Sequence, residues 1–173
     1  MTPPAGTKTI RVPLLAALLV AAADQATKMW VAKVLPLYEA KMVIAGCFDL
    51  VHVRNTGVAF SLFAGFDGRW LRPMLMAVTV LAIAGLLFFS RFLCEKKSGL
   101  WGLGLIVGGA VGNLIDRARF GYVIDFVDLY LGRFHWPAFN IADIGITAGV
   151  FLLAADMIFE NKERDAPRPP ADR

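Results

Sequence analysis

The sequence predicts an all-α membrane protein with four transmembrane helices and a small β-strand region between the first and the second. Of its 173 residues, 57% are hydrophobic and only 18% are charged, whereas soluble domains carry about 25% charged residues. The apolar residues are gathered in four long runs. Because a helix needs about 20 residues to cross a hydrocarbon core of about 30 Å, such runs indicate spanning helices.

The first two spans are expected at residues 12–34 and 71–92. The first one carries Asp24 and Lys28 in its second half. An ionisable side chain inside a span costs at least about 2.5–3.5 kcal/mol on insertion scales. The two side chains lie on one helix face at i, i+4, and we interpret them as a self-neutralising pair in preference to a direct chemical role.

The third span, at residues 100–115, is rich in glycine. Gly104, Gly108 and Gly112 recur every four residues, a spacing that lets helix backbones approach closely inside membranes. We therefore expect this helix at the centre of the bundle. The fourth span is expected at residues 139–159.

Two longer connections, at residues 35–70 and 116–138, separate the spans. Within the first, Phe48–Arg54 is rich in β-branched residues and predicts a short strand. We assign residues 1–160 to a single membrane domain. Residues 161–173 are charged and proline-rich, which is typical of a disordered tail.

The distribution of basic residues predicts the orientation. The short loop after the second span is densely basic, whereas the two longer connections carry Lys and Arg more sparsely. Cytoplasmic loops are enriched in these residues, so both termini are expected in the cytoplasm and the longer connections outside. Trp30, Trp70 and Trp136 lie near the outer ends of spans, as an aromatic belt requires.

Two segments resemble processing signals. Ala21–Ala23 resembles the cleavage site of a secretory signal, but the apolar run resumes after it. Ile44–Cys47 resembles a lipobox, but Glu39 and Lys41 interrupt the apolar run before it. We therefore expect neither to be used, and we interpret Cys47 as a small buried residue.

Further polar residues fall near the outer ends of the spans. Asn55–Ser61 is typical of a turn. Asn113 and Arg117 share one face of the third helix at i, i+4. Arg117 is equally compatible with snorkelling to the interface and with holding an acidic group through its planar guanidinium.

Asp125 and Asp143 are both expected at the outer membrane boundary. Apolar neighbours predict partial burial of Asp125, which would raise its pKa. Asp128 is expected in water on an interfacial turn. Asn140 and Asp143 have the spacing of a helix capping box, which explains both residues without any chemistry. A structural and a chemical role therefore remain equally open for them.

Two carboxylates brought close together share one proton, because both cannot ionise cheaply. The ionised member can take a proton from water, and the protonated member can hydrogen-bond a peptide carbonyl and later protonate the leaving amine. This is general acid–base hydrolysis. Such a pair titrates as a unit, so neither role is assigned to one residue. With two histidines and no CxxC motif, we expect no metal and no cofactor.

Five polar or glycine-rich blocks follow one another along the chain. They are Asp24-Gln25-x-x-Lys28, Asn55–Phe60, Gly108–Arg117, Val123–Phe126 and Phe139–Asp143. In this order, and on a four-span scaffold, they resemble the lipoprotein signal peptidase family, also called signal peptidase II. The resemblance covers nearly the whole chain.

The resemblance implies a bacterial inner-membrane aspartyl endopeptidase with Asp125 and Asp143 as its catalytic dyad and a periplasmic β-cradle from residues 35–70. The substrate would be a prolipoprotein whose lipobox Cys carries diacylglycerol, cut just before that Cys. The resemblance also implies a set of substrate-binding or dyad-supporting residues: Asp24, Lys28, Asn55, Gly57, Ala59, Phe60, Gly109, Asn113, Arg117, Asn140 and Ala142.

The expected partners are prolipoproteins and membrane lipids. No basic stripe suggests nucleic acid, and we expect a monomer with its active site at the periplasmic face. The main alternative is a small transporter or channel subunit that uses Asp24, Arg117 and Asp143 as a polar pathway. The polar residues gather at one face and do not line a full span, which argues against it. A presenilin-like protease would need a Gly-x-Gly-Asp motif, which the sequence lacks.

Overall fold

Four long helices form the membrane part of the molecule. The structure, a computed structural model, describes residues 6–57, 68–93 and 97–164. The helices are α1 (Gly6–Val34), α2 (Gly68–Leu93), α3 (Lys97–Phe120) and α4 (Ile141–Arg164). Each contains a stretch that is long and apolar enough to cross a membrane. The predicted fold class of four transmembrane helices is therefore confirmed.

Two helices end away from their predicted limits. α3 continues past residue 115 to Phe120, so that Asp116 and Arg117 lie within the helix. α4 begins at Ile141 and runs to Arg164, into the segment assigned to the tail. Apolar run length locates these ends poorly, because polar residues continue a helix beyond the apolar stretch.

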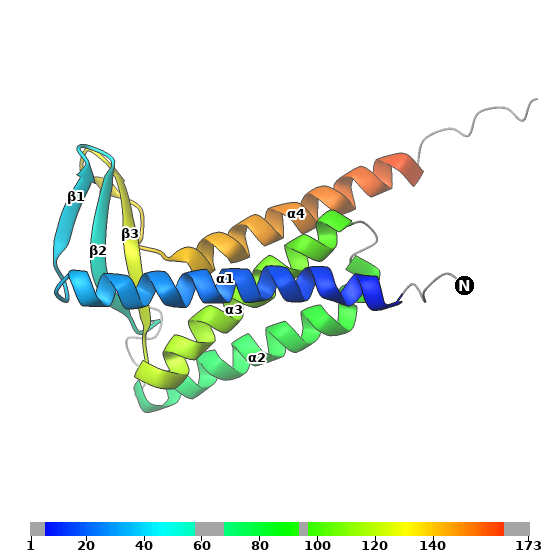
Figure 1. The fold of residues 1–173 in the computed structure, drawn as a ribbon, viewed down its shortest axis with the longest axis horizontal. Coiled ribbons are helices and arrows are strands. Elements are labelled where there is room, and N and C mark those ends of the chain that lie inside the picture. Colours follow the sequence, from blue (N-terminus) through cyan, green and yellow to red (C-terminus); the bar gives the residue numbers. More distant parts are fainter. Residues whose placement is uncertain (1–5, 58–67, 94–96, 165–173) are drawn as a thin grey trace, which may run out of the picture.

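The glycine-rich helix α3 lies between α1 and α4 and also contacts α2 (Figure 1). A Cβ atom at Gly108 would lie 2.5 Å from the carbonyl oxygen of Ala17 on α1, and one at Gly104 would approach α1 equally closely. On the other side, a Cβ atom at Gly102 would lie 2.9 Å from the carbonyl oxygen of Gly149. The backbones meet where the glycines are, and the predicted central position of α3 is confirmed.

One antiparallel sheet lies at one end of the bundle (Figure 1). Its strands, in spatial order, are β1 (Ala40–Ile44), β2 (Phe48–Asn55), β3 (Val123–Leu131) and β4 (Phe134–His135). β2 occupies the predicted strand between α1 and α2. β1 precedes β2 in the same connection, and the α3–α4 connection supplies β3 and β4, which were not predicted. The sheet therefore joins both long connections.

Strand β3 corrects the interpretation of the segment around Asp125. Asp128 was expected in water on an interfacial turn, yet Asp125 and Asp128 both lie on a strand paired with β2. The β-branched and aromatic residues around them favour this extended form. The carboxylate of Asp128 is not simply solvated, because it pairs with Nδ1 of His135 at 2.9 Å. The expectation for Cys47 was also wrong, since its side chain is exposed.

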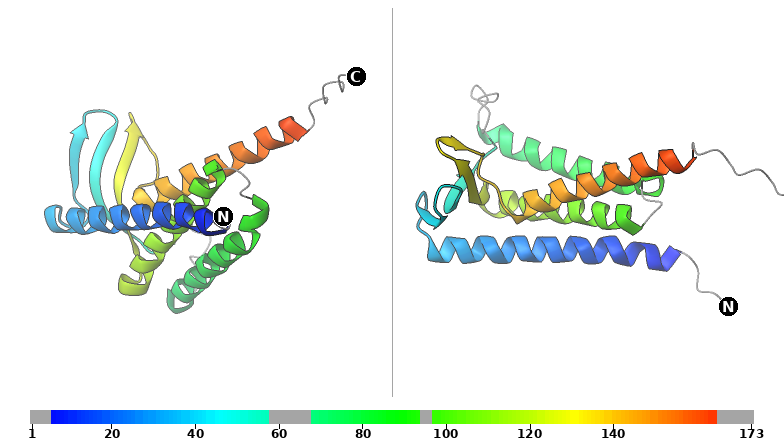
Figure 2. Two further views of the ribbon diagram at one scale, coloured as in Figure 1. Left: turned by 45° about the vertical axis from the view of Figure 1, so that its right-hand side comes forward. Right: turned by 90° about the horizontal axis from the view of Figure 1, so that it is seen from above.

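The sheet end of the bundle gathers one end of every helix. The last turns of α1 and α3 and the first turns of α2 and α4 lie there, whereas Gly6 of α1 and Arg164 of α4 mark the opposite end (Figures 1 and 2). Val31 of α1 and Leu35, the residue after α1, pack against Phe126 of β3 in the buried apolar cluster that fixes the sheet to the bundle. The segments that carry Asp125 and Asp143 are thereby brought to one place.

Replacing Gly108 by alanine is expected to lower the free energy of unfolding by about 1–3 kcal/mol, because the added methyl group would push α3 away from the backbone of Ala17. Gly85→Ala on α2 is the matched control, since the space around Gly85 is open and alanine is the better helix former. Unfolding by SDS in mixed micelles measures both variants. Equal stability would contradict the close contact of α1 with α3.

Candidate active site

A buried polar network lies where the sheet meets the helices. Six of its members are almost completely buried, namely Asp24, Lys28, Asn113, Asp116, Asp125 and Asn140. They come from α1, α3, β3 and the residue before α4. Since burying an unpaired polar group is costly, such a cluster requires hydrogen bonds for each member.

The start of α4 has the hydrogen bonds expected of a capping box. The backbone N–H of Asp143 donates to Oδ1 of Asn140 at 3.0 Å, and the backbone N–H of Asn140 donates to Oδ2 of Asp143 at 3.1 Å. This reciprocal pair caps the N-terminus of α4, which begins at Ile141, and fixes the Asp143 side chain in the first turn. The structural interpretation of the two residues is therefore correct as far as it goes.

The same Asn140 also reaches the second aspartate. Its Nδ2 donates to Oδ1 of Asp125 at 2.7 Å, and Nδ2 of Asn55 donates to Oδ2 of Asp125 at 3.0 Å. Asn55 is oriented in turn by the backbone N–H of Gly57, which lies in the left-handed region with φ +87°. Each oxygen of Asp125 thus has an amide donor, and one asparagine links Asp125 to Asp143.

The other oxygen of Asp143 accepts a hydrogen bond from an asparagine side chain on α3. Nδ2 of Asn113 donates to Oδ1 of Asp143 at 2.9 Å, while Oδ1 of Asn113 accepts from Nζ of Lys28 at 2.9 Å. Asn113 therefore connects the cation on α1 with the carboxylate on α4. Because an amide both donates and accepts, it can fill this position without adding a charge.

Burial raises the pKa of Asp125 from its ordinary value of 3.8 to about 6. The negative charge of Asp143 also contributes to this rise, whereas the hydrogen bonds from Asn55 and Asn140 favour the ionised form and partly offset it, so that a pKa of about 6 is the net result. Asp125 is only 2% exposed, so it is more deeply buried than the sequence predicted. A carboxyl group with this pKa, next to another carboxylate, can hold a proton close to neutral pH.

The expected pair of Asp24 and Lys28 is present, and Asp116 joins it as a third member that was not predicted. Nζ of Lys28 lies 2.8 Å from Oδ2 of Asp24 and 2.9 Å from Oδ2 of Asp116 on α3. Gln25 donates to Oδ1 of Asp116 at 2.8 Å. The available signal was the position of Asp116 directly before Arg117 near the end of a spanning helix, where an acid needs a buried partner.

Arg117 and the small residues of the predicted set lie around this network. Within the described residues Arg117 forms no ion pair with either aspartate; its buried Nε has no hydrogen-bond partner and its side chain lines a cavity of about 340 Å³ beside Asn113. Ala142 is fully buried, and a Cβ atom at Gly109 would clash with its carbonyl oxygen. Ala59 and Phe60 lie outside the described residues.

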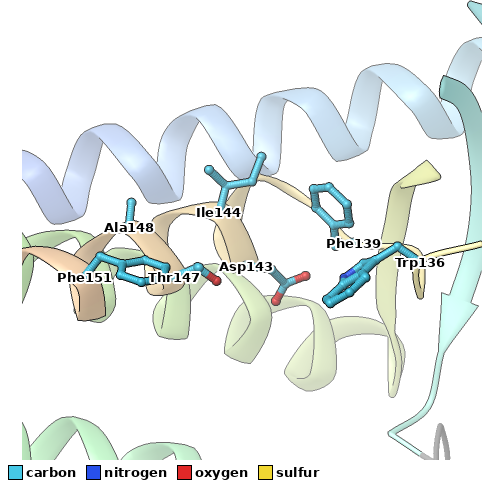
Figure 3. A pocket seen from close by; sticks show the side chains of 7 residues that line it. All are labelled: Trp136, Phe139, Asp143, Ile144, Thr147, Ala148 and Phe151. Carbon is cyan, nitrogen blue, oxygen red and sulfur yellow. The ribbon is translucent and has the colours of Figure 1, made fainter. Parts of the chain in front are cut away.

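An apolar pocket of about 470 Å³ opens beside Asp143 on the outer side of α4 (Figure 3). Figure 3 shows the Asp143 carboxylate between Trp136 and Phe139 on one side and Thr147 and Phe151 on the other. A smaller cavity of about 250 Å³ adjoins Asp125 on the side of β2. Asp143 is therefore accessible from the apolar pocket along α4, and Asp125 is accessible from the cavity beside β2.

The arrangement is suited to acid–base chemistry on a substrate that is partly apolar. Two carboxylates, one with a raised pKa, are held by neutral amides at the end of a membrane bundle. Among the described residues, no group of three or more His, Cys, Asp or Glu side chains is arranged to hold a metal ion.

Comparisons with known proteins agree in one family. The model of signal peptidase (SPase) II matches residues 16–159. A lipoprotein signal peptidase of Geobacter metallireducens is 46% identical over 142 residues, which are 82% of this chain and 86% of the relative. That of Syntrophus aciditrophicus is 44% identical over 154 residues, 87% of this chain and 94% of the relative. A solved bacterial membrane enzyme superposes with a TM-score of 0.77 at 26% identity, covering 92% of this chain and 95% of that one.

The raised pKa of Asp125 predicts how pH changes stability. Between pH 3.8 and about 6 the folded chain holds a proton on Asp125 that the unfolded chain has lost. The stability contributed by this proton is complete below pH 3.8, and it falls by up to about 3 kcal/mol as the pH rises through 6.

The Asp125→Asn variant cannot titrate at this position and is the comparison. Free energies of unfolding measured at pH 4, 5, 6 and 7 should decline more steeply for the wild type than for the variant. Parallel curves would mean that the carboxyl group of Asp125 has an ordinary pKa.

Proposed function

Since the chain belongs to the signal peptidase II family, we propose that it removes signal peptides from prolipoproteins with Asp125 and Asp143 as its catalytic carboxylates. The observation that carries the proposal is the capping asparagine before α4. Asn140 bonds Asp125 through its side chain and Asp143 through its backbone and side chain, and so holds two carboxyl groups at one site.

In the proposed reaction the dyad enters with one shared proton, held mainly on Asp125, whose pKa is raised by burial. Asp143 lies in the first turn of α4, where the helix end favours a negative charge. The Asp143 carboxylate takes a proton from water, and the oxygen of this water attacks the peptide carbonyl. Asp125 donates its proton to the carbonyl oxygen, which gives a gem-diol. Asp143 then passes the proton taken from water to the leaving amine as the C–N bond breaks, and one diol hydroxyl returns its proton to Asp125 as the carbonyl reforms.

The substrate we propose is a prolipoprotein whose lipobox Cys carries diacylglycerol, and the bond cut lies just before this Cys. Both the signal peptide and the lipid are apolar and reach the site laterally through the bilayer. The apolar pocket beside Asp143 supports this route, because its lining is mostly apolar and most of its lining residues lie on the span α4. The cavity beside Asp125 then offers a route for water.

The chain is a multi-pass bacterial membrane protein. We propose that both termini lie in the cytoplasm of an inner-membrane protein and that the sheet with the active site lies in the periplasm. The N-terminal end of α1 and the C-terminal end of α4 lie at the end of the bundle opposite the sheet, which supports placing both termini on one side of the membrane and the sheet on the other. The densely basic loop after the second span favours the cytoplasm for the termini. We also propose a monomer, since the site obtains its ion-pair and amide partners from one chain.

Purified protein in lipid should cleave a diacylglyceryl-modified prolipoprotein and leave its unmodified form intact. Asp125→Asn and Asp143→Asn should each lower kcat by about 10²–10⁴-fold, because each removes one acid–base group. Asp128→Asn is the matched control on the same strand, since Asp128 pairs with His135 away from the dyad and should not change cleavage.

A folded wild-type protein that cleaves neither form would overturn the peptidase proposal and favour a transporter. Full activity of either dyad variant would keep the peptidase but move the chemistry to other residues. Equal cleavage of both prolipoprotein forms would contradict the proposed lipid requirement.

Ala148→Phe should narrow the apolar pocket beside Asp143 and weaken substrate binding. Excluding about two methylene groups of substrate costs about 1.6 kcal/mol, or roughly 15-fold in kcat/KM. Val150→Phe is the matched control, because Val150 is exposed on the same helix and does not line the pocket. Equal kcat/KM for the two variants would remove this pocket from the substrate path.

A further inference from the structure

The buried ion cluster holds the backbone directly before each dyad aspartate. Oδ1 of Asp24 accepts the backbone N–H of Ala142 at 2.9 Å, and Ala142 precedes Asp143. Oδ2 of Asp116 accepts the backbone N–H of Ile124 at 3.1 Å, and Ile124 precedes Asp125. Two carboxylates from different helices thus make the same contact at the same distance along the chain from the two proposed catalytic groups.

Lys28 joins these two carboxylates. Its Nζ lies 2.8 Å from Oδ2 of Asp24 and 2.9 Å from Oδ2 of Asp116, and no more than 2% of any of these three side chains is exposed. Gln25 closes the cluster from the other side, with Nε2 at 2.8 Å from Asp116 and 3.3 Å from Asp24. A chain of short contacts therefore runs from the backbone before Asp143 to the backbone before Asp125.

The cluster does not face the substrate. Asp24, Lys28 and Asp116 line none of the cavities at Asp143, Arg117 and Asp125. All four of their carboxylate oxygens already accept hydrogen bonds or ion pairs within the protein. These side chains are consequently unsuited to a direct chemical role, and what they can control is position.

We infer that Asp24, Lys28 and Asp116 act as one positioning unit that sets the separation of Asp125 and Asp143. The inference rests on the proposed dyad. Buried charges tolerate only a narrow range of geometries, because any lengthening of an ion pair leaves a charge unpaired in an apolar medium. The unit therefore transmits a fixed spacing to both aspartates. A misplacement of about 1 Å can cost about 100-fold in rate, so the effect belongs in kcat.

The test compares variants that loosen the unit at different strengths. Asp24→Asn and Asp116→Asn each weaken one backbone contact and are expected to lower kcat about 100-fold. Gln25→Met removes the neutral donor without stranding a charge, and its kcat should fall about tenfold, because the displacement is milder. In all three, KM should stay within about threefold of wild type, because the pockets are untouched.

The double variant Asp24→Asn/Asp116→Asn provides a sharper test. If the unit sets one spacing, breaking either end releases it, and the double variant should lose little more kcat than one single variant. Contributions to stability alone would add and would leave kcat per folded molecule unchanged. Asp156→Asn is the matched control, since Asp156 joins α3 to α4 through Ser98 near the opposite end of the bundle; its kcat and KM should match wild type.

The substrate is the diacylglyceryl-modified prolipoprotein, and rates are divided by the folded fraction. A kcat within twofold of wild type in folded Asp116→Asn, or in folded Gln25→Met if the aspartate variants do not fold, would overturn the inference. So would a loss that appears in KM or adds fully in the double variant. If Asp125→Asn and Asp143→Asn are inactive in the same experiment, only the positioning role has failed. If they are active, the dyad has failed first.

Discussion

A lysine inside a membrane bundle is tolerated only where the protein surrounds its ammonium group with acceptors, and Lys28 meets this requirement with two carboxylates and one amide. The helices can supply these acceptors only at very close approach. A Cβ atom at Gly112 would lie 2.6 Å from Oδ2 of Asp24, so the glycine face of α3 and the ion cluster depend on each other. The ion cluster can form only because α1 and α3 pack closely at the glycines of α3.

Two asparagines connect this cluster to Asp125 and Asp143. Asn113 accepts from Lys28 and donates to Asp143, and Asn140 caps α4 while donating to Asp125. A carboxylate in these positions could accept but not donate, and an apolar side chain could do neither. The amides therefore link Lys28 to Asp143 and Asp125 by hydrogen bonds without adding a further charge.

The four spans and the cap at the start of α4 could be predicted because they depend on residues close together in the sequence. Apolar length marks the helices, and the capping spacing of Asn140 and Asp143 is visible within four residues. What escaped prediction depends on partners far away in the sequence. The strand that carries Asp125 and Asp128 is defined by pairing with β2, so the interfacial turn expected for Asp128 was wrong. The role of Asp116 depends on its ion pair with Lys28, which lies on another helix.

Arg117 illustrates the same limit from the opposite side. Its sequence position allowed both snorkelling and a role beside an acid, and in the structure it lines a cavity next to Asn113 without an ion pair to either aspartate among the described residues. A helical position predicts which face a side chain occupies. It does not predict which of several nearby acids the side chain will contact.

The contact between Asp24 and the backbone of Ala142 spans 118 residues of chain, from the first helix to the last. During synthesis α1 reaches the membrane long before α4, and its internal pair of Asp24 and Lys28 lets it enter the bilayer with its charges matched. Asp143 and its asparagine cap do not yet exist at that stage. A nascent or truncated chain therefore lacks one of the two proposed catalytic aspartates until the final helix has been made and inserted.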